Sequence, residues 1–182
     1  MHLFVLLKGV ENLAKNPGKK FEDNIKQSCN KKDIFFYRIK DVYIPYHIPQ
    51  KLRQQIKVPI NEYDNFIFGK GHLFPCELKS TGQKSFSFDE KIIKNHQINN
   101  LLKASQYEQI IPGFIFNFRN YENKTYFIHI NDFVDFKNKA ERKSIPMDIC
   151  EEFGIEIENE IKKTNYFYYI EEFINKAIEK YN

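Results

Sequence analysis

Residues 64–79 constrain the fold more than any other stretch of this chain. They read DNFIFGKGHLFPCELK, two apolar and aromatic runs on either side of a Gly-Lys-Gly sequence. This pattern predicts two antiparallel strands joined by a tight turn. Because side chains alternate along a strand, Glu77 and Lys79 are expected on one face, with Asp64 beside them on the neighbouring strand. Two carboxylates and an ammonium group placed in this way could bind a hard divalent cation and leave a positive charge next to it.

The rest of the pattern predicts one α/β domain. Asn16 before Pro17 is a typical helix start, and apolar residues follow at helical spacing. Residues 80–88 are polar and are expected to form a loop. Without an internal repeat or a second core pattern, a single domain with a central mixed sheet flanked by helices is predicted. The predicted helices are 18–31, 95–106, 131–139 capped by Asn131, a short helix from Pro146 to Phe153, and one from Ile170 to Tyr181; the predicted strands besides the hairpin are 34–39, 112–118 and 124–130.

The composition suits a protein with its own core. The chain has 182 residues, 42% of them hydrophobic, and its three cysteines form no CxxC pair. A zinc cluster is therefore not indicated, and free thiols in a reducing cytoplasm are expected. Residues 1–10 are apolar, but they are too short to span a bilayer and lack the features of a signal peptide. We expect residues 1–13 to be an extension of unknown role before a domain formed by residues 14–182, with no membrane anchor.

Charge is unevenly distributed along the chain. Residues 1–60 contain 12 Lys and Arg against 5 Asp and Glu, a net charge of +7, whereas residues 148–182 contain 4 against 9, a net charge of −5. A basic N-terminal third would attract a phosphate backbone, although a solvated lysine-rich face would look the same. Within it, residues 41–62 are broken by three prolines and combine basic with aromatic residues. A stretch this long without regular structure favours a functional projection over an idle surface loop.

Phosphodiester hydrolysis is the chemistry that Asp64, Glu77 and Lys79 fit. It requires a nucleophilic water and charge neutralisation at phosphorus, which Mg²⁺ held by carboxylates supplies. Lys79 could stabilise the developing charge or orient the water. Glu22 on the first helix could add a carboxylate, and Gln97 on a later helix an amide oxygen. The spacing alone is a weak signal, because Glu and Lys on an exposed strand are more often cross-strand partners than ligands.

Several stretches along the chain carry a family pattern. They are Asn16-x-Gly18-x-x-Phe21-Glu22, Asp64 to Glu77-Leu-Lys79-Ser-Thr81, His96-Gln97-Ile98-x-x-Leu101, Gly113-Phe-Ile-Phe-Asn-Phe118-Arg119, Arg142-Lys-Ser-Ile-Pro146 and Gly154. The order of elements resembles the PD-(D/E)xK nuclease core, a restriction-endonuclease-like fold. More specifically, residues 14–168 resemble the RecU-type Holliday junction resolvases of low-GC Gram-positive bacteria and their phages. The run at 142–146 has no obvious chemical role, so it indicates family membership and not convergent spacing.

The resemblance implies roles for individual residues. Asp64 and Glu77 would bind Mg²⁺, or Mn²⁺ in its place, and Lys79 would stabilise the transition state. Gln97 would be a further active-site or metal-shell residue, and Glu22 an acidic residue of the same site. The chain departs from the family at Glu62, where the family often has Thr, and this carboxylate could either bind the metal or disturb it.

The implied function is a Mg²⁺-dependent endonuclease acting in recombination and repair. It would resolve four-way junctions as a homodimer by paired nicks that leave 5′-phosphate ends. Residues 41–62 stand where the family projects a stalk into the junction centre, although this segment is shorter than some family stalks. A restriction-like or flap nuclease on the same core and a non-catalytic DNA-binding protein are the alternatives. The residues expected to contact DNA are Lys19, Lys20, Arg38, Lys51, Arg53 and Lys57.

Overall fold

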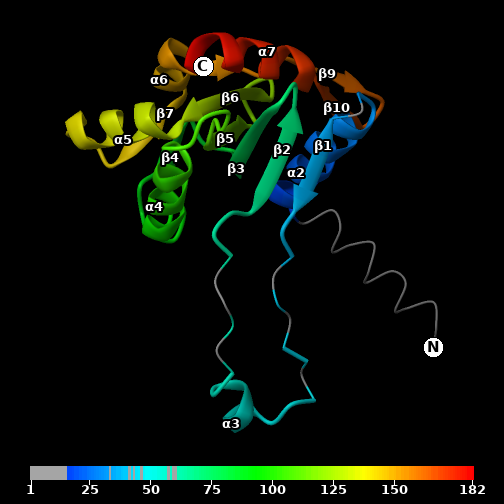
Figure 1. Cartoon of the computed structure of the whole chain (residues 1–182), viewed down its shortest axis with the longest axis vertical. Coiled ribbons are helices and arrows are strands. Elements are labelled where there is room, and N and C mark those ends of the chain that lie inside the picture. Colours follow the sequence, from blue (N-terminus) through cyan, green and yellow to red (C-terminus); the bar gives the residue numbers. More distant parts are fainter. Residues whose placement is uncertain are drawn as a thin grey trace.

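A six-stranded mixed sheet forms the centre of the protein (Figure 1). The computed structural model describes residues 16–32, 34–40, 42, 44–45, 47–56, 58 and 61–182. The strand order is β1-β2-β3-β5-β6-β8, with β3 and β5 parallel and the other neighbouring pairs antiparallel. The predicted mixed sheet is therefore confirmed. Its strands are β1 (Phe35–Arg38), β2 (Asn65–Gly69), β3 (His72–Thr81), β5 (Gly113–Phe118), β6 (Lys124–His129) and β8 (Ile155–Glu156).

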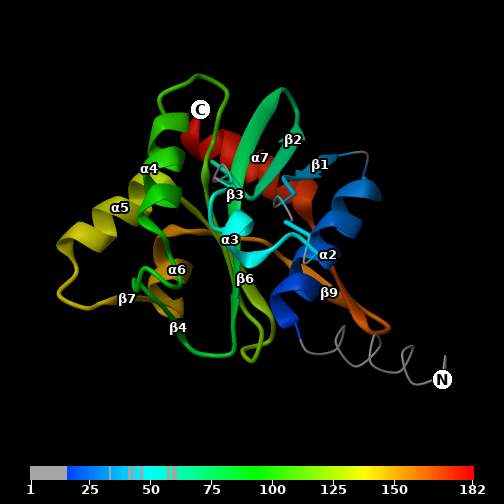
Figure 2. The same ribbon diagram turned by 90° about the horizontal axis from the view of Figure 1, so that it is seen from below.

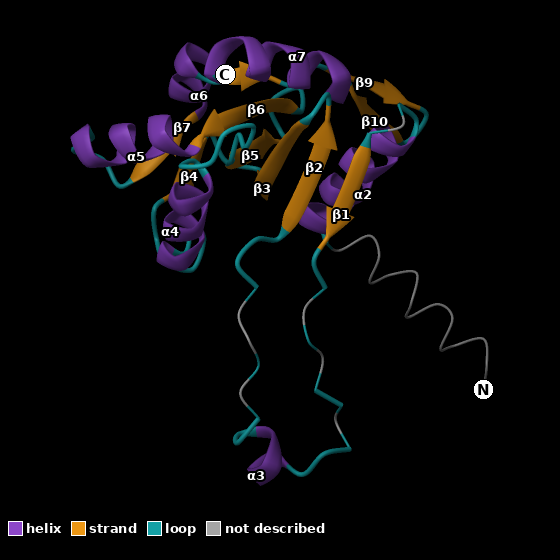
Figure 3. Cartoon of the chain, viewed as in Figure 1, coloured by secondary structure: helices purple, strands orange, loops and turns teal. Residues whose placement is uncertain are grey.

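Helices lie on both faces of the sheet because its central strands are apolar on both sides. Along β5, Ile115 packs into one core while Phe114 and Phe116 pack into the other, and all three are fully buried. Since parallel strands need a crossover, α4 lies in the connection between β3 and β5 and packs against β3. The first face carries α2 (Pro17–Asn30) and α7 (Ile170–Tyr181), and the second carries α4 (Asn95–Ala104), α5 (Ile130–Lys139) and α6 (Met147–Phe153) (Figure 1, Figure 3).

Two local predictions are confirmed. β2 and β3 form the expected antiparallel hairpin, and its turn places Lys70 and Gly71 at positive φ angles of 52° and 77°. A glycine adopts this left-handed conformation without strain. At the start of α2, the side-chain oxygen of Asn16 accepts a hydrogen bond from the backbone N–H of Lys19 over 3.1 Å, and Pro17 is the first helical residue. The amino-acid types at these positions therefore determine both the turn and the helix start.

The prediction of a loop over residues 80–88 is wrong. β3 continues to its end at Thr81, and β4 (Ser85–Ser87) pairs antiparallel with β7 (Ser144–Pro146). Phe86 lies opposite Ile145 in this pair, and both are buried in the core beneath α4. Because Phe86 is a single apolar residue between two serines, the sequence showed no strand pattern there. Residues 85–87 form a strand only through pairing with the distant β7.

Two helix starts and one hairpin also differ from prediction. α5 begins at Ile130, one residue early, because His129 is the capping residue: its Nδ1 accepts from the backbone N–H of Asn131 over 3.3 Å. α6 begins at Met147, since Pro146 ends β7. The sequence also did not predict the hairpin of β9 (Asn159–Lys162) and β10 (Asn165–Tyr168), which packs beside α2.

The segment between β1 and β2 projects away from the body of the protein (Figure 1). We call residues 41–62 the stalk segment. Among its described residues, the helix α3 (Gln50–Arg53) lies at the far end, directly after Pro49. Viewed from below, α3 lies in front of the sheet, which shows that the projection is roughly along the line of sight (Figure 2).

Two expectations drawn from the composition concern the cysteines and membrane-spanning segments. Cys29, Cys76 and Cys150 are buried free thiols, so they act as small apolar core residues. No described helix combines the length and the apolar character that crossing a membrane requires.

Candidate active site

Asp64 and Glu77 meet where the stalk segment joins the sheet. Asp64 directly precedes β2, and Glu77 lies in the middle of β3. The backbone N–H of Asp64 donates to Glu77 Oε1 over 3.1 Å, and Glu77 is only 1% exposed. Lys79 follows on the same strand face, with its Nζ 3.5 Å from Glu77 Oε2. The structure therefore brings together the three residues that strand alternation placed on one face.

Gln97 joins this group from the first turn of α4. Its Nε2 donates to Glu77 Oε2 and, over 3.5 Å, to Asp64 Oδ2. Its Oε1 accepts from Lys79 Nζ over 3.2 Å and from the backbone N–H of Lys94 over 3.3 Å. One amide group thus contacts both carboxylates and the ammonium group, and it also caps the start of the helix.

The electrostatics of the carboxylate pair fit a cation site. Burial raises the pKa of the Glu77 carboxyl to about 8, and the hydrogen bond and charge of Asp64 act in the same direction, while Lys79 opposes them. The Glu77 carboxyl, buried beside the half-buried Asp64, therefore holds a proton at neutral pH when no metal ion is bound. A divalent cation in place of that proton would offset both the desolvation and the repulsion, and carboxylate oxygens are the ligands that Mg²⁺ prefers.

Protein side chains alone would not complete the coordination of a metal ion. Among the described residues, no three or more Asp, Glu, His and Cys side chains are grouped so that they could hold one. Asp64 and Glu77 would supply two ligands, and water and substrate oxygens the others, as is usual for Mg²⁺. Gln97 turns its amide nitrogen to the carboxylates and its oxygen to Lys79. In this orientation it positions the other groups, and its oxygen would have to turn round to act as the predicted ligand.

Asp64, Lys79 and Gln97 line a cavity of about 280 Å³, and Glu22 reaches this cavity from α2. Glu22 Oε1 lies 3.0 Å from the Nε of Arg38, which also lines the cavity. Burial raises the pKa of Glu22, and the positive charge of Arg38 offsets this only in part. The structure therefore brings Glu22 into the same cavity as Asp64, as a partner of Arg38.

The sequence analysis did not predict two basic residues that line this cavity. Lys91 and Lys94 lie in the turn before α4 and line the cavity beside His96. Their position within six residues of Gln97 is a signal that could have been used, because the residues before a helix start lie close to its first turn. With Lys79 they give the cavity a positive wall suited to phosphate.

The other predicted site residues lie apart from this cavity. Glu62 is exposed and does not line it, and its backbone carbonyl accepts from Asn100 Nδ2 over 3.1 Å. On α2, Lys19 pairs with Asp23 at 3.7 Å, and Lys20 donates to the backbone carbonyl of Thr164 over 3.0 Å. Of the basic residues expected on the stalk segment, Lys51 and Arg53 belong to α3, and Lys57 lies outside the described residues.

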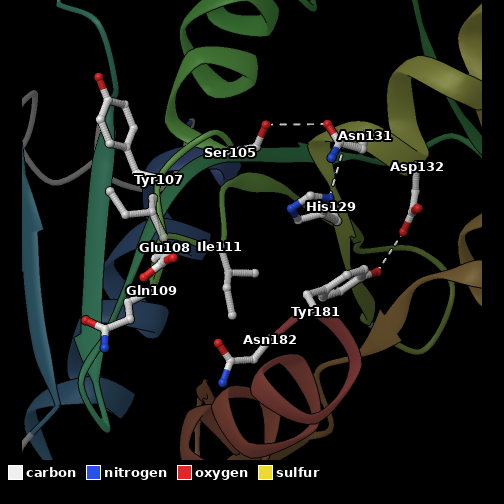
Figure 4. Close-up of a pocket in the computed structure, with 11 residues that line it drawn as sticks. Ser105, Tyr107, Glu108, Gln109, Ile111, His129, Asn131, Asp132, Tyr181 and Asn182 are labelled. Carbon is white, nitrogen blue, oxygen red and sulfur yellow. Dashed lines mark hydrogen bonds between the residues drawn. The ribbon is translucent and has the colours of Figure 1, made fainter.

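A larger cavity, of about 620 Å³, lies at the opposite end of α4 (Figure 4). There the ring of His129 stacks on Tyr181 at 4.6 Å, and the Tyr181 hydroxyl donates to Asp132 over 2.7 Å. Burial lowers the pKa of His129. None of Asp64, Glu77 and Lys79 lines this cavity, so it is not the candidate site.

Comparison with known proteins assigns this arrangement to a family. The RecU family, described as Recombination protein U, matches residues 16–176 of the chain. The chain belongs to the RecU family. The matched range contains Glu22, Asp64, Glu77, Lys79 and Gln97, and the resemblance seen in the sequence is confirmed.

This RecU-family chain is also similar to individual known proteins. It is 50% identical over 179 residues to the SPbeta prophage-derived uncharacterized protein YotM of Bacillus subtilis strain 168, covering 92% of this chain and 89% of that one. It is 31% identical over 161 residues to the Holliday junction resolvase RecU of Ureaplasma parvum serovar 3, covering 87% and 82%. Among solved structures it resembles Archaeoglobus fulgidus Hjc, a Holliday junction resolvase from an archaeal hyperthermophile, with a TM-score of 0.50 and 10% identity over 76% of this chain and 94% of that one. The last match shows the fold, as predicted.

Proposed function

We propose that this RecU-family protein is a Mg²⁺-dependent DNA endonuclease that resolves four-way junctions. The observation that carries the proposal is the buried Glu77 held against Asp64, Lys79 and Gln97, which line a cavity with basic walls. The choice of a four-way junction is supported by the name of the Ureaplasma parvum relative. Mn²⁺ is expected to replace Mg²⁺, and paired nicks by a homodimer would leave 5′-phosphate ends.

Each side chain of the site has a distinct task in this proposal. Mg²⁺ held by Asp64 and Glu77 supplies a Lewis acid and an acidified water. Lys79 donates to a non-bridging phosphate oxygen and stabilises the charge that develops there. Gln97 fixes the Lys79 ammonium by its hydrogen bond of 3.2 Å. Arg38, which Glu22 orients, attracts the phosphate together with the lysines of the cavity wall.

A labelled four-way junction incubated with Mg²⁺ or Mn²⁺ tests the proposal. We expect symmetric paired nicks, no cleavage in EDTA, and much slower cleavage of a linear duplex with the same arm sequences. Equal cleavage of duplex and junction would favour a restriction-like enzyme, and preferred cleavage of flaps a flap nuclease. Binding without any metal-dependent cleavage would leave only a DNA-binding role.

Replacement of Lys79 by Met should slow cleavage while leaving metal binding in place. Loss of one donor to the developing charge typically lowers kcat by about 10²–10³-fold. We expect Lys79→Arg to keep a larger fraction of the activity, because it keeps the positive charge. Single-turnover cleavage of the junction measures both variants, and Met at wild-type rate would contradict the assigned task.

The basic residues of α3 should contribute to junction affinity through phosphate contacts. Lys51→Ala with Arg53→Ala removes two positive charges, so the slope of log affinity against log salt should decrease by about 1 per lost contact. Lys139→Ala on α5 is the matched control, since it is exposed and lies far from the stalk segment (Figure 1). Filter binding or fluorescence anisotropy over a salt series measures the slopes, and an unchanged slope in the double variant would exclude α3 from the contact.

A further inference from the structure

The cavity of about 620 Å³ that His129 lines takes no part in the proposed nuclease chemistry (Figure 4). We call it the His129 cavity, and its volume is in the range of sites that bind small molecules or short peptide segments. Ser105, which follows the end of α4, lines it, whereas Gln97 of the candidate active site lies in the first turn of that helix. At a rise of 1.5 Å per residue, the two residues are about 12 Å apart along the helix axis. A ligand here would occupy a site separate from the candidate active site.

His129 presents a hydrogen-bond donor to this cavity. The residue is only 8% exposed, and its Nδ1 accepts from the backbone N–H of Asn131 over 3.3 Å. Because an accepting Nδ1 carries no proton, the proton of the neutral ring is on Nε2. Figure 4 shows the other ring nitrogen turned away from Asn131, toward the open space of the cavity, and no described residue accepts a hydrogen bond from it. A buried N–H without a protein partner is rare, and this one is available to a ligand that carries an acceptor.

The charges of the cavity favour a positively charged ligand. Glu108 and Asp132 line it, and no Lys or Arg of the described residues does. Asp132 accepts from the Tyr181 hydroxyl through Oδ2 over 2.7 Å, and no described residue donates to its Oδ1. Lys180, next to Tyr181, is directed elsewhere, because its Nζ donates to the backbone carbonyl of Phe153. Two carboxylates without a cation beside them in the cavity attract one from outside.

Two tyrosine rings strengthen the attraction for an organic cation. Tyr107 lines the cavity and is 66% exposed, and Tyr181 stacks on His129 with ring centroids 4.6 Å apart. The negative face of an aromatic ring attracts ammonium and guanidinium groups. A metal ion fits this cavity less well, because the ring nitrogen of His129 that faces the cavity carries a proton and has no lone pair to offer.

We propose that the His129 cavity binds a basic peptide segment of a partner protein. Such a segment carries both groups that the cavity requires: a backbone carbonyl to accept from His129 Nε2, and a Lys or Arg side chain to pair with Asp132 and Glu108. A nucleic acid would bring its phosphates against two carboxylates, so it is disfavoured. The partner would be attached at one end of α4 while the active-site cavity at the other end stays open. The purpose of the attachment rests on the proposed function, whereas the binding itself does not.

Titration of the full chain with capped peptides, followed by NMR of the histidine side-chain nitrogens, tests the proposal. The probe is acetyl-Gly-Lys-Arg-Gly-amide, and acetyl-Gly-Glu-Glu-Gly-amide is the control of equal length. The signals of His129 are assigned by their loss in His129→Asn, in which Asn can still cap α5. We expect the free protein to show the Nε2–H tautomer. The basic peptide should shift the Nε2 signal with a Kd of about 1 mM or lower, and the acidic peptide should leave it unchanged.

Two substitutions at the cavity should weaken the binding of the basic peptide. Asp132→Asn removes a charged acceptor but can still accept from Tyr181, so we expect a Kd about tenfold higher. Asp135→Asn is the matched control, because it makes the same change on α5 at a residue that does not line the cavity, and its Kd should equal that of the wild type. His129→Asn should raise the Kd by a similar factor of about ten, since it removes the buried donor. Circular dichroism melting shows whether each variant folds, and the wild-type signal together with Asp132→Asn decides the point if His129→Asn does not.

Three results would overturn the inference. They are an Nδ1–H tautomer of His129 in the free protein, no shift of its signal at a basic peptide concentration of about 10 mM, and equal weakening by Asp132→Asn and Asp135→Asn. Peptide binding needs neither metal nor DNA, so it decides this point even if the wild type cuts no junction, in which case only the proposed function fails. If the wild type does cut, a saturating concentration of the basic peptide should leave the cleavage rate unchanged. Inhibition would place the peptide in the active-site cavity and would also contradict the inference.

Discussion

We expect Asp64→Asn and Glu77→Gln each to slow junction cleavage by about 10³-fold or more, while junction binding should stay close to that of the wild type. Each substitution keeps the shape of the side chain and removes one of two charges that would hold the metal ion. A bound metal ion contributes several kcal/mol of transition-state stabilisation, which corresponds to this loss of rate. Single-turnover cleavage and fluorescence anisotropy on the same labelled junction separate the two effects.

The matched control for these variants is Asp135→Asn. Asp135 is exposed on α5, where it forms an ion pair with Lys139 at 3.7 Å. Its replacement makes the same chemical change away from the cavity and should leave cleavage unchanged. Cleavage at wild-type rate by Asp64→Asn or Glu77→Gln would show that the carboxylate pair is structural and would contradict the proposed function.

The free energy of unfolding of the metal-free protein should decrease as the pH rises from about 4.5 to about 8. Burial raises the pKa of Glu77 from 4.5 to about 8, so between these values the folded protein holds a proton that the unfolded chain has released. Stability falls with pH wherever the folded state binds more protons. Each pH unit costs at most about 1.4 kcal/mol, and the whole interval about 5 kcal/mol. Glu22, whose pKa burial also raises, adds to the same trend.

Mg²⁺ should reverse this loss, because it binds the ionised carboxylates and displaces the proton. Stabilisation by Mg²⁺ should therefore increase with pH up to about 8, the pKa of Glu77, and change little above it. Denaturant unfolding between pH 5 and pH 9, in EDTA and in Mg²⁺, measures both curves. In Glu77→Gln the decline in EDTA should largely disappear, and this variant should be more stable than the wild type at pH 9. If the free energy of unfolding of the wild type in EDTA rose over this interval, a protonated Glu77 in the metal-free protein would be excluded.

Local patterns were sufficient for the hairpin and for the common face of Glu77 and Lys79. The Gly-Lys-Gly turn, the alternation that puts Glu77 and Lys79 on one face, and the helix start at Asn16 depend on neighbouring residues alone. Each could therefore be predicted from the sequence without knowledge of the fold. The family pattern carried the recognition further, because it tied Glu22 and Gln97 to the same site across long separations in the chain.

Other features depend on packing between segments that lie far apart in the chain. β4 becomes a strand only because Phe86 meets Ile145 nearly sixty residues later. Lys91 and Lys94 reach the cavity because the crossover between two parallel strands brings the start of α4 over β3.

The site residues of the β2–β3 hairpin depend on both kinds of information, local pattern and distant packing. Their order along β2 and β3 follows from side-chain alternation, which is a property of the backbone. The burial that raises the pKa of Glu77 comes from α4, whose Gln97 contacts it from twenty residues away. Burial is set by which elements pack together, and only the tertiary structure decides that.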